Sequence, residues 1–250
     1  MHNPLLKVDN LQRSYGKLRA VQNISFDLNK GEVLGFLGPN GAGKSTTMQM
    51  LSGVLAPDAG EILIDGIDIA KQPASAKAKI GYLPETPPLY PDLTVQEYLY
   101  YVARLHRISG PDTHEAVQQV LEQCNLVQHT RKLIGTLSKG YQQRVGVAQA
   151  IIHKPDIILL DEPTNGLDPI QIREIRTLIQ QLGLEHAIVL SSHILPEVEA
   201  SCSRVLILNN GSIVFSEQME NLQERSLEQI FIELTCGEQT LQATEHKAAG

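Results

Sequence analysis

A glycine-rich stretch early in the chain contains the residues whose types and spacing point most directly to chemistry. It fits the pattern GxxxxGK[ST] and lies between a compact apolar run, 32–37, and a segment with a helical pattern, 46–52. Its residues are Gly38, Pro39, Asn40, Gly41, Ala42, Gly43, Lys44 and Ser45. Glycines let backbone N–H groups converge on phosphate oxygens without a Cβ atom in the way, and the helix N-terminus adds partial positive charge. The stretch therefore predicts a nucleotide-binding loop.

Two side chains of this loop have separate expected tasks. We expect the ammonium of Lys44 to reach the β- and γ-phosphates and the hydroxyl of Ser45 to ligate Mg²⁺. Thr46, the next residue, completes the set that we expect to contact the nucleotide. A glycine-rich turn that binds nothing is the alternative, but it leaves the lysine and the costly glycines without a purpose.

Two acidic residues follow a second apolar run. Asp161 and Glu162 come directly after Ile157–Leu160, which has the unbroken apolar character of a strand covered on both faces. Open α/β sheets bind ligands at the carboxyl ends of their strands. We expect Asp161 to contact Mg²⁺ through water and Glu162 to polarise the water that attacks the γ-phosphate. A pair of solvated loop acids is the alternative.

A histidine, His193, follows a third apolar run, Ala187–Leu190, and two serines. A lone histidine at such a place is more often a hydrogen-bonded structural residue than a catalyst. If its strand lies beside the strand that ends at Asp161, however, His193 faces the same crevice and can hold the γ-phosphate and the attacking water. We therefore count it as a catalytic candidate, together with Lys44 and Glu162.

The stretch Leu137–Arg144 reads LSKGYQQR and resembles the LSGGQ signature of ABC ATPases. Ser138 is expected at the start of a helix. With Gly140 it offers a hydroxyl and free backbone N–H groups to a phosphate, as a second anion site apart from the loop at 38–45. The stretch precedes Asp161 in an inserted helical region, which is the family's order of motifs. The resemblance covers about residues 5–234.

This resemblance implies an ATPase that works as a head-to-tail dimer. Each ATP would lie between the phosphate loop of one chain and the signature, Ser138 and Gly140, of the other, with Mg²⁺ as the second cofactor. Tyr15 would stack on adenine, although an ordinary surface aromatic is the alternative. The loop Gly166–Asp168 would cross the dimer interface, and His193 would be the family's switch histidine.

Three positions depart from the family pattern. Glu85 stands where the family usually has glutamine, which makes it a candidate contact for Mg²⁺ or water with an additional negative charge. Lys139 replaces the first glycine of the signature, and Tyr141 replaces its glutamine. Ser138 and Gly140, the pair expected nearest the γ-phosphate, are retained.

The elements that must position these residues follow from the spacing of apolar side chains. Short strands are expected over 5–8 and 20–28, and a further short strand, at an exposed edge, contains Ile62 and Ile64. Helical spacing prevails from Thr94 to Ile152, where Thr94 and Glu97 have the spacing of a capping box.

Strands and helices alternate in the second half of the chain. A helix that ends at Gly183 lies between the strands 157–160 and 187–190, which predicts a parallel sheet. Its apolar face consists of Ile172, Ile175, Ile179 and Leu182. A hairpin over 205–208 and 212–215 and an amphipathic helix over 227–234 follow.

With the resemblance, these elements predict an α/β fold: a RecA-like P-loop NTPase core, an N-terminal antiparallel β subdomain and an inserted α-helical subdomain. We expect one domain over 1–235. Residues 1–85 and 153–235 would form the core with its β subdomain, and 86–152 would form the helical signature subdomain. Residues 236–250 are expected to form a polar tail.

Composition limits the classes of function. The chain has 250 residues, of which 42% are hydrophobic and 20% charged, and this suits a globular fold. Its formal net charge of -7 supplies no broad basic surface, so we expect no nucleic-acid partner. Three scattered cysteines without a CxxC pair fit a reducing compartment, and no apolar run approaches the roughly 20 residues that cross a bilayer.

ABC ATPases with Leu-Pro-Glu at the loop that ends in Glu85 often serve export systems. The resemblance therefore implies an ATPase that powers transport, with export favoured, by a separate polytopic membrane permease. A second ATPase subunit would complete a homodimer, cytoplasmic and peripheral on the inner face of the cell membrane. The loop Thr86–Pro91 is either a stiff recognition surface for the permease or a linker into the next helix.

Two other classes remain as alternatives. ABC-type ATPases that act on nucleic acid or ribosomes carry long coiled coils or tandem ATPase domains, which one uninterrupted copy of 250 residues does not match. Small-molecule kinases also use the phosphate loop. The order of the signature and Asp161-Glu162 argues against a phosphoryl acceptor.

Overall fold

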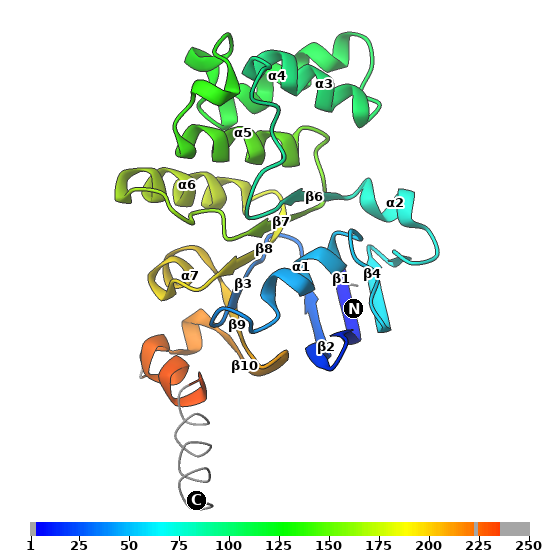
Figure 1. Cartoon of the computed structure of the whole chain (residues 1–250), viewed down its shortest axis with the longest axis vertical. Helices are drawn as coiled ribbons and strands as arrows, with labels where there is room; N and C mark the ends of the chain where they lie inside the picture. Colours follow the sequence, from blue (N-terminus) through cyan, green and yellow to red (C-terminus); the bar gives the residue numbers. More distant parts are fainter. Residues whose placement is uncertain (1–3, 223–224, 236–250) are drawn as a thin grey trace, which may run out of the picture.

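The protein is built around two β-sheets, as Figure 1 shows. This computed structural model describes residues 4–222 and 225–235. The first sheet is antiparallel in the order β2-β1-β4-β5. Its strands are β1 (Leu6–Tyr15), β2 (Leu18–Leu28), β4 (Ala59–Ile64) and β5 (Ile67–Asp68).

The second sheet has six strands in the order β10-β9-β3-β8-β7-β6. They are β3 (Val33–Leu37), β6 (Ile80–Leu83), β7 (Ile157–Asp161), β8 (Ala187–Ser192), β9 (Arg204–Asn209) and β10 (Ser212–Gln218). All neighbours pair in parallel except β9 and β10, which form the expected antiparallel hairpin. The predicted parallel sheet is confirmed.

Helices cover this sheet and form a separate group at one end of the molecule (Figure 1). They are α1 (Lys44–Leu51), α2 (Pro73–Lys77), α3 (Val95–Leu105), α4 (Pro111–Gln123), α5 (Lys139–Ile151), α6 (Pro169–Leu182) and α7 (Leu195–Ser201). Short 3₁₀ turns lie at Val127–His129, Ile134–Thr136 and Met219–Leu222. The expected amphipathic helix near the C-terminus is present over 227–235, and the predicted polar tail lies outside the described residues.

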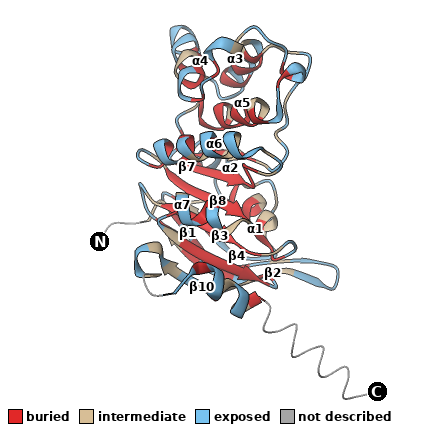
Figure 2. Ribbon diagram, turned by 90° about the vertical axis from the view of Figure 1, so that its left-hand side faces the viewer, coloured by how far each residue is buried: buried red, intermediate tan, exposed pale blue. Residues whose placement is uncertain are grey.

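Side chains of the six-stranded sheet enter two apolar cores. Along β7, Ile157 and Leu159 join the core beneath the antiparallel sheet and α1, whereas Ile158 and Leu160 join the core shared with the other helices. This alternation follows from the two-residue period of a strand. Figure 2 shows the central strands as buried throughout, because both faces are covered. Their polar carboxyl-terminal residues therefore lie in a rigid setting.

One expectation about the antiparallel sheet is wrong. The strand that contains Ile62 and Ile64 is β4, and it lies between β1 and β5 instead of at the edge. The two isoleucines are only 2% and 1% exposed. The chain turns at Asp65 and Gly66, both with positive φ, and pairs β5 against the outer side of β4. The short β5 carries too few apolar residues for the sequence pattern to reveal it.

The predicted capping box opens α3. The Thr94 hydroxyl accepts a hydrogen bond from the Glu97 N–H at 3.2 Å, and the Thr94 N–H donates to the Glu97 carboxylate at 2.9 Å. These bonds satisfy two donors that the first turn of a helix leaves free. The apolar face of α3 then packs against α4 and α5.

We predict that Thr94→Ala lowers the free energy of unfolding by about 1 kcal/mol, because the cap is lost. Urea denaturation followed by circular dichroism measures the change. Asp92→Ala is the matched control, since its exposed carboxylate bonds no other described residue. Equal stability of the two variants would contradict the energetic role of the cap.

Candidate nucleotide site

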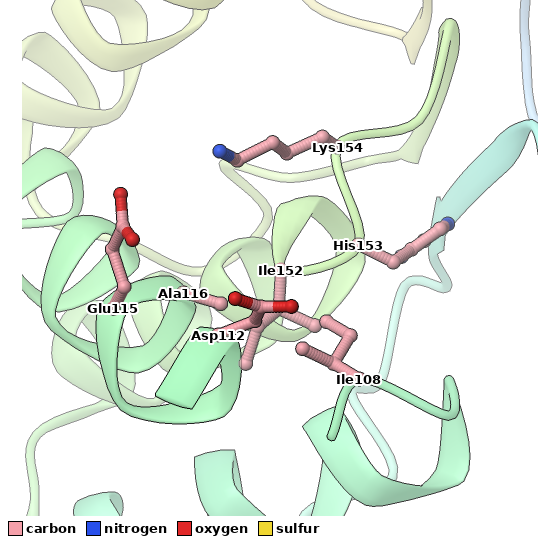
Figure 3. Close-up of a pocket in the computed structure, with 7 residues that line it drawn as sticks. All are labelled: Ile108, Asp112, Glu115, Ala116, Ile152, His153 and Lys154. Atoms are coloured by element: carbon pink, nitrogen blue, oxygen red, sulfur yellow. The ribbon is translucent and has the colours of Figure 1, made fainter. Parts of the chain in front are cut away.

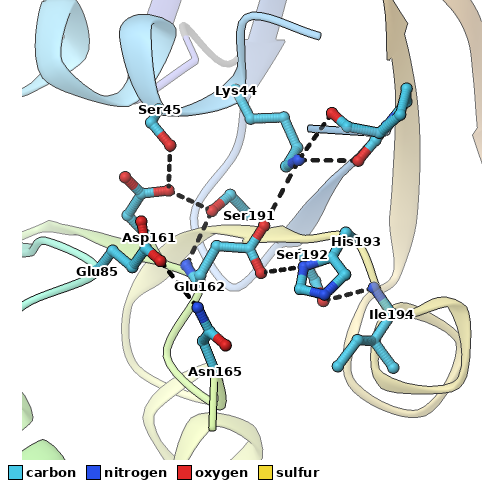
Figure 4. Close-up of polar contacts among 12 residues, drawn as sticks. Lys44, Ser45, Glu85, Asp161, Glu162, Asn165, Ser191, Ser192, His193 and Ile194 are labelled. Carbon is cyan, nitrogen blue, oxygen red and sulfur yellow. Dashed lines mark hydrogen bonds and ion pairs between the residues drawn. The ribbon is translucent and has the colours of Figure 1, made fainter. Parts of the chain in front are cut away.

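The glycine-rich loop connects β3 to α1 and bends tightly at its glycines. Gly43 has a φ of 99°, and a Cβ atom there would lie 2.5 Å from the carbonyl oxygen of Ala20 in β2. Only glycine allows both this conformation and this close approach. The loop thereby turns the N-terminus of α1 towards the carboxyl ends of the parallel strands, as Figure 4 shows.

Lys44 lies folded back over this loop. Its ammonium donates hydrogen bonds to the carbonyl oxygens of Gly38 and Pro39, at 2.8 and 3.2 Å. It also lies 3.5 Å from Glu162 Oε1, and both side chains are nearly buried. A buried cation needs such acceptors, and the oxygens of a phosphate group can take their place as acceptors for the same ammonium.

Asp161 ends β7 opposite the start of α1. Its Oδ1 atom accepts hydrogen bonds from the hydroxyls of Ser191, at 2.6 Å, and Ser45, at 3.2 Å. Burial raises the pKa of this carboxyl, the two hydroxyls lower it, and the charges of Glu162 and Glu85 raise it again; the net shift is upward. A carboxylate with a raised pKa gains from a nearby cation.

The donor set at this point fits Mg²⁺. Asp161 and Ser45 both offer oxygen atoms, which are the ligands that a hard divalent cation takes. Within the described residues, no group of three or more acidic, histidine or cysteine side chains converges on a metal position. A cation held by few protein ligands keeps water and phosphate oxygens, as Mg²⁺ does beside nucleotides.

Glu162 is held from several sides. Its backbone lies in the left-handed region with a φ of 48°, and its N–H donates to Ser191 Oγ at 2.9 Å. One carboxylate oxygen faces Lys44, and the other lies 2.7 Å from His193 Nδ1. A strained backbone stabilised in this way is common where a side chain must be aimed. This arrangement directs the Glu162 carboxylate towards the space above the glycine-rich loop.

His193 reaches this carboxylate because β7 and β8 pair in parallel. Asp161 is the register partner of Ser191, so the residues after both strands meet at one edge of the sheet. The condition that we set for placing His193 in the crevice is therefore met. Side chains from these strand ends and residues of the glycine-rich loop line one hollow of about 320 Å³. It is lined by Asn40, Gly41, Gly43, Lys44, Ser45, Thr46, Glu85, Glu162, Asn165 and His193.

Glu85 enters this hollow from the loop after β6. Its Oε1 atom accepts a hydrogen bond of 2.8 Å from the side-chain amide of Asn165, which lies in the turn that follows Glu162. Glu85 is exposed, and in Figure 4 it lies beside Asp161. The third candidate for a cation contact is thus close to the other two.

The remaining candidates lie outside this hollow. Tyr15 ends β1, is 46% exposed and has the guanidinium of Arg13 at 5.2 Å from its ring centroid. Ser138 is the N-cap of α5, but its hydroxyl forms no capping bond. Gly140 is buried against Gln171 of α6. The fold therefore separates the signature from the phosphate loop of the same chain.

Two residues of the site were not predicted from the sequence. Ser191 joins the two acids, and Asn165 joins Glu85 to the turn after Glu162. A serine pair directly after the apolar run 187–190 was the available signal for Ser191. Nothing local distinguished Asn165, because its partner lies 80 positions away.

A second hollow lies between α4 and the end of α5, as Figure 3 shows. Asp112, Glu115 and Lys154 line it with apolar neighbours. His153 points away from these acids, and its Nε2 atom lies 3.0 Å from the carbonyl oxygen of Ile80 in β6. Charges of both signs without a glycine-rich loop give this hollow no phosphate-binding geometry.

The fold and the glycine-rich loop together define the class of protein. A parallel sheet with a glycine-rich loop after β3, a lysine at the start of α1 and acids at the end of β7 make this protein a P-loop NTPase. A family model described as "ABC transporter" matches residues 21–165. The chain belongs to this family, and it is an ATP-binding and ATP-hydrolysing subunit of the ABC transporter type.

Curated relatives share most of the chain. The linearmycin resistance ATP-binding protein LnrL of Bacillus subtilis (strain 168) is 37% identical over 232 residues, which are 92% of this chain and 75% of that protein. The bacitracin transport ATP-binding protein BcrA of Bacillus licheniformis is 38% identical over 233 residues, with the same coverage of 92% and 75%.

Solved structures have the same fold. An ATP-binding subunit of an ABC transporter has a TM-score of 0.82 at 30% identity, over 92% of this chain and 99% of that one. A dimeric ATP-binding cassette in a post-hydrolysis state with ADP and Pi has a TM-score of 0.76 at 26% identity, over 86% and 98%.

We predict that Ser191→Ala lowers the free energy of unfolding by about 1 to 3 kcal/mol, because the buried Asp161 carboxylate and Glu162 N–H lose a shared partner. It should also slow ATP hydrolysis, measured as phosphate release. Ser192→Ala is the matched control, since its equally buried hydroxyl donates to Glu197 instead. Equal hydrolysis rates of the two variants would contradict a function of Ser191 in the site.

Proposed function

We propose that this chain is the motor of an export system whose membrane permease is a separate protein. The observation that supports ATP hydrolysis is the position of the Glu162 carboxylate, directly above the phosphate loop. One of its oxygens contacts Lys44 and the other contacts His193. The names of the relatives, which refer to linearmycin resistance and bacitracin transport, favour export.

Each side chain then has one task in hydrolysis. Lys44 leaves the carbonyls of Gly38 and Pro39 for the β- and γ-phosphates, where its charge is better matched. Glu162, released from Lys44, accepts a proton from the water that attacks the γ-phosphate. His193 holds that carboxylate at 2.7 Å and orients the γ-phosphate.

Mg²⁺ would be held by Ser45 and, through water, by Asp161, with Glu85 as a further contact. It would neutralise the charge of the phosphate oxygens. Ser191 keeps Asp161 in place by a hydrogen bond of 2.6 Å. Asn165 holds Glu85 in the same way from the turn after Glu162.

Two copies of the chain form the complete sites. The Ser138 side chain forms no capping bond at the start of α5, and Ser138 does not line the hollow that contains Lys44. A head-to-tail pair brings Ser138 and Gly140 of one chain to the nucleotide of the other, while Tyr15 stacks on adenine. The solved ATP-binding cassette that is dimeric with ADP and Pi supports a pair of chains.

The permease docks on a groove of about 450 Å³ between the core and the helical region. Its lining residues are Glu85, Thr86, Pro87, Leu89, Pro91, Ile134, Lys139, Gln142, Gln143 and Asn165. Glu85 and Asn165 belong to both this groove and the nucleotide hollow. Docking and hydrolysis therefore share a hydrogen bond, which allows one to influence the other.

Location and division of the chain follow from this assignment. No helix of the described residues is long and apolar enough to span a bilayer. We place the chain on the cytoplasmic face of the membrane through its permease. We also divide it into a core with its β subdomain, 1–85 and 153–235, and a helical signature subdomain, 86–152, that form one domain.

We predict that Glu162→Gln slows hydrolysis by about 10²- to 10⁴-fold, because the base is lost, and accumulates an ATP-bound dimer. Size-exclusion chromatography with ATP and phosphate release measure both effects. Glu199→Gln, an exposed carboxylate on α7, is the matched control. Normal steady-state hydrolysis by Glu162→Gln would refute the role assigned to Glu162.

Lys44→Ala should bind ATP weakly and form no dimer.

Co-purification from detergent tests the transport function. The full chain should retain a polytopic membrane protein, and Leu89→Asp should lose it, because a charge enters the apolar part of the groove. Leu184→Asp, at an exposed position on the core, is the control that retains it. Retention of ribosomes or DNA in place of a membrane protein would overturn the proposal.

A further inference from the structure

The end of the β1–β2 hairpin lies against the phosphate loop. Tyr15, the last residue of β1, pairs with Leu18 across the turn, and Ala20 follows two positions further along β2. The Ala20 carbonyl oxygen borders the loop so closely that a Cβ atom on Gly43 would lie 2.5 Å from it. Tyr15 is therefore on the part of the antiparallel sheet that adjoins the residues expected to hold the phosphates.

The guanidinium of Arg13 lies over the aromatic ring of Tyr15. Its Cζ atom is 5.2 Å from the ring centroid, which is within the range of a cation–π contact. A guanidinium in this position covers one face of a ring and leaves the opposite face free. Because Tyr15 is 46% exposed, a flat group such as a nucleobase can still stack on its ring.

Arg13 is held in this position by the segment that leads into β4. Its Nη1 atom donates hydrogen bonds to Asp58 Oδ1 at 2.8 Å and to the Ala56 carbonyl oxygen at 3.1 Å. The Ser14 N–H donates to the other carboxylate oxygen of Asp58 at 2.7 Å. Asp58 thus bonds both the side chain that contacts Tyr15 and the backbone directly before Tyr15.

The strand itself is irregular at this point. The register between β1 and β2 shifts between Arg13 and Ser14. A shift of this kind bends a strand and redirects the side chains that follow it. Because Asp58 bonds both residues at the shift, the bend that precedes Tyr15 is fixed from outside the hairpin.

An ion pair that serves only the stability of the fold is the alternative explanation of Arg13 and Asp58. Their side chains are 25% and 44% exposed, and ion pairs in such positions add little to stability. What the arrangement does achieve is to restrict an exposed aromatic ring beside the phosphate loop. This restriction points to a function of the ring in binding.

We propose that Arg13 is a positioning residue for the nucleobase: it holds the Tyr15 ring in the orientation that stacks on adenine. This inference rests on the proposed contact of Tyr15 with adenine. A ring that is ordered before binding loses less conformational freedom when the base arrives. Arg13 therefore contributes to the affinity for the base and leaves the affinity for the phosphates unchanged.

Binding of ADP and of inorganic pyrophosphate separates these two contributions, because pyrophosphate has the same two phosphates without the nucleoside. In the full chain, Arg13→Met removes the guanidinium and keeps a long side chain. It should weaken ADP binding about two- to fivefold and leave pyrophosphate binding unchanged, as measured by isothermal titration calorimetry with Mg²⁺. Arg13→Lys keeps the cation and should restore most of the ADP affinity. Lys7→Met removes an exposed charge at the opposite end of β1 and should match the wild type with both ligands.

A double-mutant cycle with Tyr15→Ala tests whether Arg13 acts through the ring. Tyr15→Ala alone should weaken ADP binding at least about fivefold, because the stacking surface is lost. Once the ring is absent, the further change Arg13→Met should cost no additional ADP affinity. Unchanged pyrophosphate binding shows that each variant retains its folded phosphate loop.

Three results would overturn the proposal. They are an equal loss for ADP and pyrophosphate in Arg13→Met, full ADP affinity in Arg13→Met, and an additional loss in the double variant. The stack itself is judged separately. Wild-type ADP affinity in Tyr15→Ala would refute the contact with adenine and the function of Arg13 together, whereas a loss in Tyr15→Ala with none in Arg13→Met would refute only the latter.

Discussion

The parallel pairing of β3, β8 and β7 is the constraint on which the site depends. Leu37 pairs with Ser192, and Ser191 pairs with Asp161, so the carboxyl ends of the three strands meet at one edge. The phosphate loop, the two acids and His193 follow these strands and converge without long connections. Because the strands are buried on both faces, the edge is rigid, and short hydrogen bonds can set the position of each side chain.

Charge at this edge is concentrated and incompletely balanced. Asp161, Glu162 and Lys44 are all nearly buried, two acids against one base. Burial raises the pKa of Asp161, although two hydroxyls bond to it. A nucleotide with a divalent cation would bring charges of both signs and so relieve the cost of burying these groups. The electrostatic arrangement that is costly without a ligand therefore favours binding of one.

The helical region adds a second level of organisation. Its signature helix, α5, is joined to α6 by the ion pair between Arg144 and Glu174. The groove beside this region shares Glu85 and Asn165 with the nucleotide hollow. The nucleotide hollow, the signature helix and the groove are thus joined by side chains from segments far apart in the sequence. In the proposed transport system, such connections would convert a change at the γ-phosphate into a movement at the groove.

Much of the fold and of the site of this protein could be predicted from its sequence. The phosphate loop, the acids after an apolar run, the capping box at Thr94 and the parallel sheet are local patterns, and local spacing records them directly. Tertiary structure alone decided that β4 is covered by β5, that Ser191 joins Asp161 to Glu162, and that Asn165 bonds Glu85. The reason is physical. Strand order and side-chain contacts between remote segments arise from packing of the whole chain, and no short stretch of residues encodes its distant neighbour.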